Sequence, residues 1–278
     1  MDDALPFALP DMGEEETQEV VACLRSGWLT TGPRTKRFEE DMVAALGGEV
    51  HALAVCSATA GLHLALEALG VGPGDEVLMP SFTFVSTANA YVLRGASPVF
   101  VDIDPRTGNL DPDDLERRIT PASRAVVVVH YAGISCDMDR IGAIAAAHGL
   151  VVIEDNAHGL FGTWRDRPLG TLGAMATLSF HETKNVTCGE GGALVLTDSA
   201  LVERAEIIRE KGTNRSQFVR GEVNRYAWMD VGSSYLLSDV LAAVLASQLE
   251  ECDAIQARRR LVWERYREDL GVWAEGHG

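Results

Sequence analysis

Short apolar runs recur along the chain, and each is followed by a stretch with helical periodicity. The clearest run is Ala125–His130 (AVVVVH), which is β-branched at four successive positions. A strand that is apolar throughout must be covered on both faces, which is typical of a mostly parallel sheet between two layers of helices. The pattern predicts strands at 51–55, 77–79, 98–101, 125–130, 151–154, 175–180 and 193–196. It predicts helices at 14–26, 36–46, 62–69, 85–93, 111–119, 138–148, 200–211 and 236–269, with no β-rich unit in 271–278. The expected class is therefore α/β.

Composition excludes several functions. The 278 residues carry a formal net charge of −17, which argues against a nucleic-acid partner because nucleic acids select basic surfaces. No apolar stretch approaches the roughly 20 residues of a membrane span. The acidic N-terminus lacks the basic region of a secretory signal. Five dispersed cysteines form neither a CxxC pair nor a zinc-like cluster, so we expect reduced thiols, a cytoplasmic location and no metal.

Lys184 is the first candidate for chemistry. Only three of the 24 basic residues are lysines, and Lys184 follows the predicted strand 175–180 within the sequence SFHETKN. A lysine at the end of a core strand can lose its proton through partial burial and form a Schiff base with a carbonyl carbon. A surface lysine with no such role is the alternative.

Asp155 ends the strand VVIED, and a carboxylate there points into the crevice beyond the strand ends. It can hold a heterocyclic nitrogen in its protonated form, as the pyridine ring of pyridoxal phosphate (PLP) requires. A helix cap or loop carboxylate is the alternative. Glu154 should face the other side of the strand and is interpreted as structural.

Two further stretches complete a pattern. The small residues of Cys56–Leu62 (CSATAGL) leave backbone N–H groups free to hold a phosphate at a helix start. An aromatic side chain in Pro80–Thr87 (PSFTFVST) could stack on a flat ring, although a core aromatic is an alternative for each. Together, four features match the four parts of PLP. The small-residue turn suits the phosphate, the aromatic side chain suits the ring face, the strand-end aspartate suits the ring nitrogen, and the strand-end lysine suits the aldehyde.

The chain resembles the DegT/DnrJ/EryC1/StrS family of sugar aminotransferases, PLP enzymes with the aspartate-aminotransferase fold (fold type I). The similarity runs from about residue 5 to residue 270. It is carried by PGDEVLMPSFTFVSTANAYVLR at 73–94, HYAGISCDMD at 130–139, SFHETKN at 179–185 and ERAEIIREKGTNRSQF at 203–218. The resemblance implies transfer of an amino group from glutamate to a nucleotide-linked 4-keto-6-deoxy sugar. dTDP-4-dehydro-6-deoxyglucose, which becomes dTDP-4-amino-4,6-dideoxygalactose, is the substrate implied.

The resemblance also implies a role for each matching residue. Lys184 would be the Schiff-base lysine, Asp155 the partner of the ring nitrogen, and Phe84 the stacking aromatic. His158 would lie against the ring. The phosphate would be held by Thr59, by Ser179 and by the backbone of Ala58 and Ala60. Relatives are homodimers with active sites at the interface, where Ser234 replaces the asparagine that the partner chain often supplies. Lys211 and Arg215 are candidates for the substrate phosphates, and a structural role at a helix end is the alternative.

The resemblance implies a division of the chain into a PLP-binding large domain at 1–240 and a helical connector at 241–278. The connector would lead to a small C-terminal domain of roughly a hundred residues, which is largely absent from this sequence. The loop 187–191 is about one residue shorter than in close relatives. A catalytically silent homologue that binds PLP or a partner chain is therefore the alternative to an active aminotransferase. A nucleotide-binding α/β protein without PLP is a third interpretation.

Overall fold

The structure is a computed structural model that describes residues 8–277. Residues 1–7, whose acidic character argues against a secretory signal, and residue 278 lie outside the described part. Seven strands form one sheet in the order β1-β9-β8-β5-β4-β2-β3. Their bounds are β1 His51–Val55, β2 Glu76–Pro80, β3 Ser97–Val101, β4 Ser123–Val129, β5 Val151–Asp155, β8 Met175–Ser179 and β9 Gly192–Leu196. Only β9 runs antiparallel to its neighbours, β1 and β8, so the sheet is mostly parallel as predicted.

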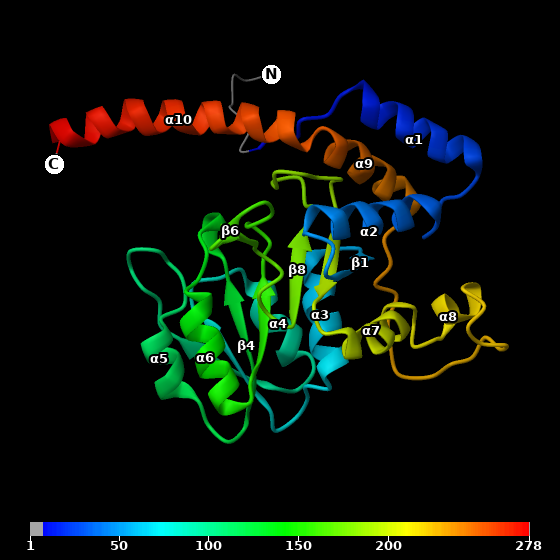
Figure 1. The fold of residues 1–278 in the computed structure, drawn as a ribbon, viewed down its shortest axis with the longest axis horizontal. Helices are drawn as coiled ribbons and strands as arrows, with labels where there is room; N and C mark the ends of the chain where they lie inside the picture. The colour runs from blue at the N-terminus through cyan, green and yellow to red at the C-terminus, as the bar shows by residue number, and fades with distance from the viewer. Residues whose placement is uncertain (1–7, 278) are drawn as a thin grey trace.

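Helices cover both faces of the sheet (Figure 1). The helices α3 (Ala58–Leu69), α4 (Val85–Val92) and α7 (Val202–Arg209) pack on one face. On the other face lie α2 (Pro33–Ala45), α5 (Pro112–Arg118), α6 (Met138–His148) and α9 (Asp239–Glu250). Alternate residues of one strand enter opposite layers: Val127 packs with the first group of helices, whereas Val126 and Val128 pack with the second. This alternation explains why β4 is apolar at every position.

The C-terminal part differs from the sequence prediction. The stretch 236–269, predicted as one helical region, contains two helices, because α9 ends at Glu250 and α10 (Cys252–His277) begins two residues later. The predicted helix end at 269 is too early, because α10 continues to His277. A glycine such as Gly271 costs a helix about 1 kcal/mol and does not by itself end one.

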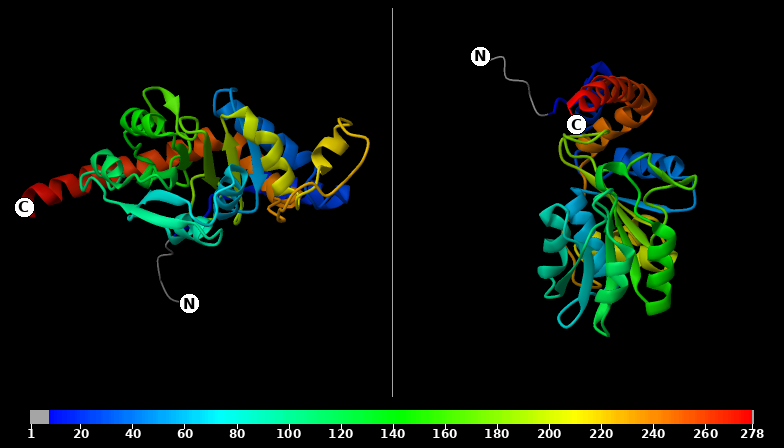
Figure 2. Two further views of the ribbon diagram at one scale, coloured as in Figure 1. Left: turned by 90° about the horizontal axis from the view of Figure 1, so that it is seen from below. Right: turned by 90° about the vertical axis from the view of Figure 1, so that its left-hand side faces the viewer.

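The N-terminal helix α1 (Glu14–Ser26) packs against α9, and α10 leaves the body as a long extension (Figures 1 and 2). The predicted domain boundary at 240 falls in the first turn of α9, whose residues Ala242 and Leu245 belong to the core shared with α2 and the sheet. The division of the chain into two domains stays a prediction. Within residues 8–277, no helix is long and apolar enough to cross a membrane.

Several short elements escaped the sequence prediction. They are the hairpin β6 (Thr163–Trp164) and β7 (Arg167–Pro168), the helix α8 (Arg215–Val219), and the 3₁₀ turns η1 (Tyr131–Gly133) and η2 (Ser199–Leu201). Elements of two to five residues give too little periodicity to be recognised. Helix α3 begins at Ala58 rather than at 62, because Ser57 caps it by accepting a hydrogen bond from the Ala60 amide at 3.0 Å.

Candidate active site

A cavity of about 480 Å³ lies beyond the carboxyl ends of the parallel strands. The chain enters it after β1, β2, β4, β5 and β8, so segments far apart in sequence meet there. This is the edge of an open α/β sheet where ligands bind. Seven of the predicted site residues line the cavity: Ala58, Thr59, Phe84, Asp155, His158, Ser179 and Lys184. Lysine and aspartate therefore share one cavity, as the sequence predicted.

The start of α3 forms one wall. Among residues 8–277, the amides of Ala58 and Thr59 have no hydrogen-bond partner, so both are available to an anion at the positive end of the helix dipole. The Ala60 amide is not available, because it donates to Ser57 Oγ; the predicted phosphate role of the Ala60 backbone needs this correction. Gly192 allows the close approach of β9, since a Cβ there would lie 2.5 Å from the Ala58 nitrogen.

Asp155 is 7% exposed and its two carboxylate oxygens have separate donors. The Thr87 hydroxyl donates to Oδ2 at 2.8 Å, and the Ala157 amide donates to Oδ1 at 3.3 Å. Burial raises the pKa of Asp155, and these two hydrogen bonds oppose the shift. His158 and Lys184 oppose it further through their charges. A cation placed next to this carboxylate would keep it ionised.

Burial also acts on the two basic groups of the cavity. It lowers the pKa of Lys184 below the ordinary lysine value, and only Asp155 opposes this shift. Burial and the charge of Lys184 lower the pKa of His158. The half-buried Lys184 amine therefore loses its proton more readily than the amine of a surface lysine. The neutral amine is the form that attacks a carbonyl carbon.

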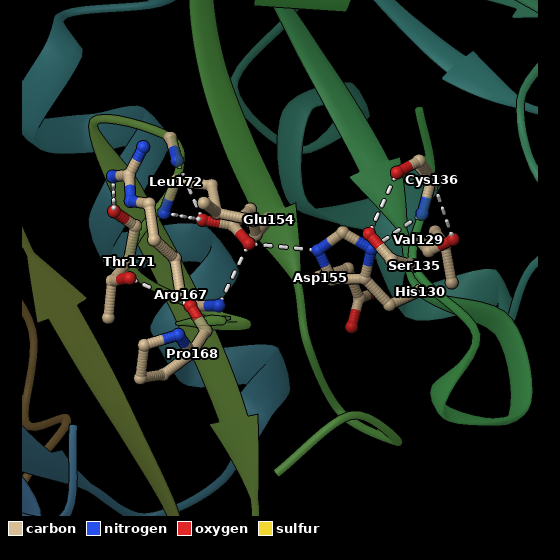
Figure 3. Close-up of polar contacts among 12 residues, drawn as sticks. Val129, His130, Ser135, Cys136, Glu154, Asp155, Arg167, Pro168, Thr171 and Leu172 are labelled. Atoms are coloured by element: carbon tan, nitrogen blue, oxygen red, sulfur yellow. Dashed lines mark hydrogen bonds and ion pairs between the residues drawn. The ribbon is translucent and has the colours of Figure 1, made fainter. Parts of the chain in front are cut away.

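Glu154 lies on the other side of β5 and belongs to a buried hydrogen-bond network (Figure 3). Its carboxylate accepts from His130 Nε2 at 2.8 Å and from the amides of Gly170, Leu172 and Gly173 at 2.7 to 2.8 Å. The Cys136 amide donates to His130 Nδ1 at 3.2 Å, so the imidazole proton is on Nε2. Burial raises the pKa of Glu154, but the hydrogen bonds outweigh it and leave the pKa below its usual range. The structural interpretation of Glu154 is consistent with this arrangement.

Sequence reasoning missed Tyr131, which lines the cavity, and Thr87, a fully buried residue outside the lining that contacts Asp155. Thr87 was part of the quoted stretch 80–87 but received no role; it lies four residues after Thr83, and their hydroxyls are 2.9 Å apart. Tyr131 lies two residues after the end of β4, and its ring centroid is 4.2 Å from that of Phe82 and 5.8 Å from that of His158. The position of Tyr131 at a strand end was the available signal.

Four predicted residues are outside the lining of this cavity within the same chain: Ala60, in the first turn of α3, and Ser234, Lys211 and Arg215. Lys211 Nζ and Arg215 Nη1 both lie near Glu210 Oε1, at 3.5 and 3.7 Å. Glu210 also forms an isolated β-bridge with Ser234, which places Ser234, Lys211 and Arg215 in one region around the end of α7. The structural alternative given for Lys211 and Arg215 is thus consistent with their contacts.

The cavity fits PLP by its chemistry. The free amides of α3 suit a phosphate, the buried Asp155 carboxylate suits a ring N–H, and Lys184 suits the aldehyde. Within the described residues no group of three or more His, Cys, Asp or Glu side chains could hold a metal ion.

The chain has well-matched relatives. The model of the DegT/DnrJ/EryC1/StrS aminotransferase family matches residues 10–276. Spore coat polysaccharide biosynthesis protein SpsC of Bacillus subtilis is 44% identical over 266 residues, which are 95% of this chain and 68% of SpsC. The aminotransferase TlmJ of Streptoalloteichus hindustanus has a TM-score of 0.89 at 37% identity, covering 96% of this chain and 72% of TlmJ. Spr1654 of Streptococcus pneumoniae, solved in its PMP-form, has a TM-score of 0.88 at 31% identity, covering 95% of this chain and 72% of Spr1654. Spr1654 is also known in its PLP-form.

Fold and cavity together define a PLP-dependent aminotransferase of the α/β type. The mostly parallel seven-stranded sheet agrees with that class, and a solved relative is known in both PLP and PMP forms. The chain belongs to the DegT/DnrJ/EryC1/StrS family and is a sugar aminotransferase.

Proposed function

We propose that this protein transfers the amino group of glutamate to a nucleotide-linked 4-keto-6-deoxy sugar. The specific substrate proposed is dTDP-4-dehydro-6-deoxyglucose, and the product is dTDP-4-amino-4,6-dideoxygalactose. The observation that supports the reaction is the meeting of Lys184 and Asp155 in one cavity with the free amides of α3. The identity of the sugar follows from the sequence resemblance.

The proposed roles follow from the position of each side chain. Bound PLP supplies an electron sink and a carrier for the amino group. In this proposal the Ala58 and Thr59 amides, the Thr59 hydroxyl and Ser179 bind the phosphate, while Phe84 covers the ring. Asp155 holds the proton on the ring nitrogen, and His158 lies against the ring.

Lys184 has the role that moves protons. The lowered pKa of Lys184 makes its neutral amine easier to reach than in a surface lysine. The neutral amine would accept a proton from the α-carbon of the donor and return it to the other side of the imine. The aromatic side chains of Phe82, Phe84 and Tyr131 line the cavity, and Phe84 is 76% exposed, so its ring is available to a flat ligand. Asp155 itself is 7% exposed, and this burial strengthens its interaction with a cationic ring.

We further propose a homodimer in which the region around Ser234, Lys211 and Arg215 reaches the cavity of the partner subunit. These residues lie outside their own cavity, and nearby Trp228, Met229 and Val231 are exposed apolar side chains. Exposed apolar residues that gather in one segment are typical of an interface. Sedimentation should give twice the chain mass; a monomer at catalytic concentrations would contradict this part.

The function is tested with purified protein, PLP and L-glutamate. We expect one equivalent of 2-oxoglutarate per site and conversion of the cofactor to its amino form. Addition of the keto sugar nucleotide should then convert the amino form back to PLP. The Lys184→Ala protein should bind PLP and release no 2-oxoglutarate above background. PLP binding without 2-oxoglutarate in the natural chain would contradict the proposal and support the silent homologue.

A further inference from the structure

We propose that Thr87 is a positioning residue, whose hydroxyl fixes the orientation and the ionised state of Asp155. This inference rests on the proposed function, because it concerns the carboxylate assigned to the ring nitrogen. Thr87 lies in the first turn of α4, on a different element from Asp155 at the end of β5. The two residues are 68 positions apart, and the contact depends on the packing of α4 against the sheet.

The first step is the direction of the hydrogen bond. An ionised carboxylate can only accept, so the Thr87 hydroxyl must use its single hydrogen on Asp155 Oδ2, 2.8 Å away. Its oxygen is then free to accept from Thr83 Oγ1, which lies 2.9 Å from it. The result is a directed chain from Thr83 through Thr87 to Asp155. Thr87 is fully buried, so water cannot replace this donor.

The second step concerns the other contacts that hold the Asp155 carboxylate in place. Oδ1 accepts from the Ala157 amide, and no arginine or lysine side chain among residues 8–277 forms an ion pair with Asp155. The backbone of β5 is fixed from the opposite face by the Glu154 network (Figure 3). With the backbone fixed, the rotamer of Asp155 depends on its side-chain donor. Thr87 is the only side chain in the described part of the protein that donates to Asp155.

The third step concerns the ionisation state of Asp155. Burial favours the neutral form of Asp155, and the hydrogen bond from Thr87 is the foremost effect that opposes the rise in its pKa. Without this hydroxyl the proton shared between the ring nitrogen and the carboxylate should move toward Asp155. A neutral Asp155 would no longer hold the ring nitrogen in its cationic form.

Thr177 provides a matched control. It is buried to the same extent, it lies opposite Asp155 on the neighbouring strand β8, and its hydroxyl has no hydrogen-bond partner among the described residues. Thr177→Val therefore removes a hydroxyl from the same region without removing a bond to Asp155. Thr87→Ser keeps the hydroxyl and should restore the wild-type behaviour, whereas Thr87→Val and Thr87→Ala both remove it.

The experiment uses PLP labelled with ¹⁵N at the ring nitrogen and bound to the full chain. The ¹⁵N chemical shift reports whether the ring nitrogen is protonated, independently of turnover. A fluorescence titration gives the affinity for PLP. We expect the Thr87→Val and Thr87→Ala shifts to move toward that of unprotonated pyridine, with PLP affinity reduced roughly tenfold, the size of a hydrogen bond to a charged group. Thr87→Ser and Thr177→Val should match the wild type.

The outcomes separate this inference from the proposed function. An unchanged ¹⁵N shift in folded Thr87→Val and Thr87→Ala proteins would overturn it while leaving the function intact. An equal change in Thr177→Val would also overturn it, because the effect would then come from losing any nearby hydroxyl. A wild-type chain that does not bind PLP would instead contradict the proposed function.

Discussion

The chemistry of this protein depends on the environment of a few side chains. Lys184 and Asp155 are ordinary residues whose proton affinities are moved in opposite directions by burial: the pKa of the lysine falls and that of the aspartate rises. Each charge opposes the shift of the other, so the pair is matched to a ligand that lies between them and interacts with both. The surrounding protein, rather than the residue type, makes this lysine suitable for catalysis.

The lowered pKa of Lys184 predicts a pH dependence. Burial disfavours its ammonium form, so the amine should become reactive at a pH below the 10.5 of an ordinary lysine. Labelling with acetic anhydride over a pH series, read by mass spectrometry, should give a half-maximum for Lys184 below that of N-acetyl-lysine in the same tube. Coincident curves would contradict the burial argument.

The strand-end residues could be predicted from sequence because strands and their ends are visible in the apolar pattern. Lys184 and Asp155 were found in this way, whereas His158 was named only from the resemblance to the family. The Thr87 contact could not be predicted, because it joins residues on two elements whose packing the local pattern does not encode. The use of the Ala60 amide in the helix cap was missed for a different reason. Small residues at the start of a helix indicate a cap and a phosphate site equally well, so the sequence does not distinguish the two.

At the scale of elements, Glu154 joins β4, β5 and the segment that precedes β8. Four donors from two segments meet on one carboxylate, and its only side-chain partner among the described residues is a histidine whose Nδ1 already accepts a hydrogen bond. Breaking a buried charged network of this kind leaves donors without an acceptor. The network should therefore contribute strongly to stability and to the position of the strand end that carries Asp155.

Glu154→Gln tests this contribution. We expect the free energy of unfolding at neutral pH to fall by about 3 kcal/mol or more, since an amide cannot accept from all four donors. The folded pKa of Glu154 is depressed below its ordinary 4.5, so its contribution is complete above pH 4.5 and is lost as the pH falls through the folded value. The difference from wild type should therefore narrow in acid.

Urea unfolding at several pH values measures this difference. The matched control is Glu116→Gln, an exposed glutamate on α5 with no hydrogen bond or ion pair within the described residues, which should change stability by less than about 0.5 kcal/mol. Equal effects of the two substitutions would refute the role of the network.

The order of elements could be predicted because parallel strands and amphipathic helices have clear periods. Their ends were less accurate, since a cap such as Ser57 or a proline at the start of a helix, as at Pro33, sets the boundary instead of the apolar pattern. The break between α9 and α10 occurs at Glu251, which has φ −92° and ψ 4°. No glycine or proline marks that position, so the sequence gives no sign of it.

At the scale of the whole molecule, the acidic chain keeps its few lysines apart. Lys36 pairs with Glu40 on α2, Lys211 pairs with Glu210 after α7, and Lys184 lines the cavity. The chain spans 68% to 72% of the lengths of the relatives described above, and the cavity is built within that span. Cofactor binding can thus be tested on this chain as it stands.

The covalent capture of PLP tests the account most directly. PLP-treated protein is reduced with borohydride, digested and analysed by mass spectrometry, and each of the three lysines lies on a distinguishable peptide. The account predicts one pyridoxyl group per chain, on Lys184. Modification of Lys36 or Lys211 in its place, or no modification at saturating PLP, would contradict it.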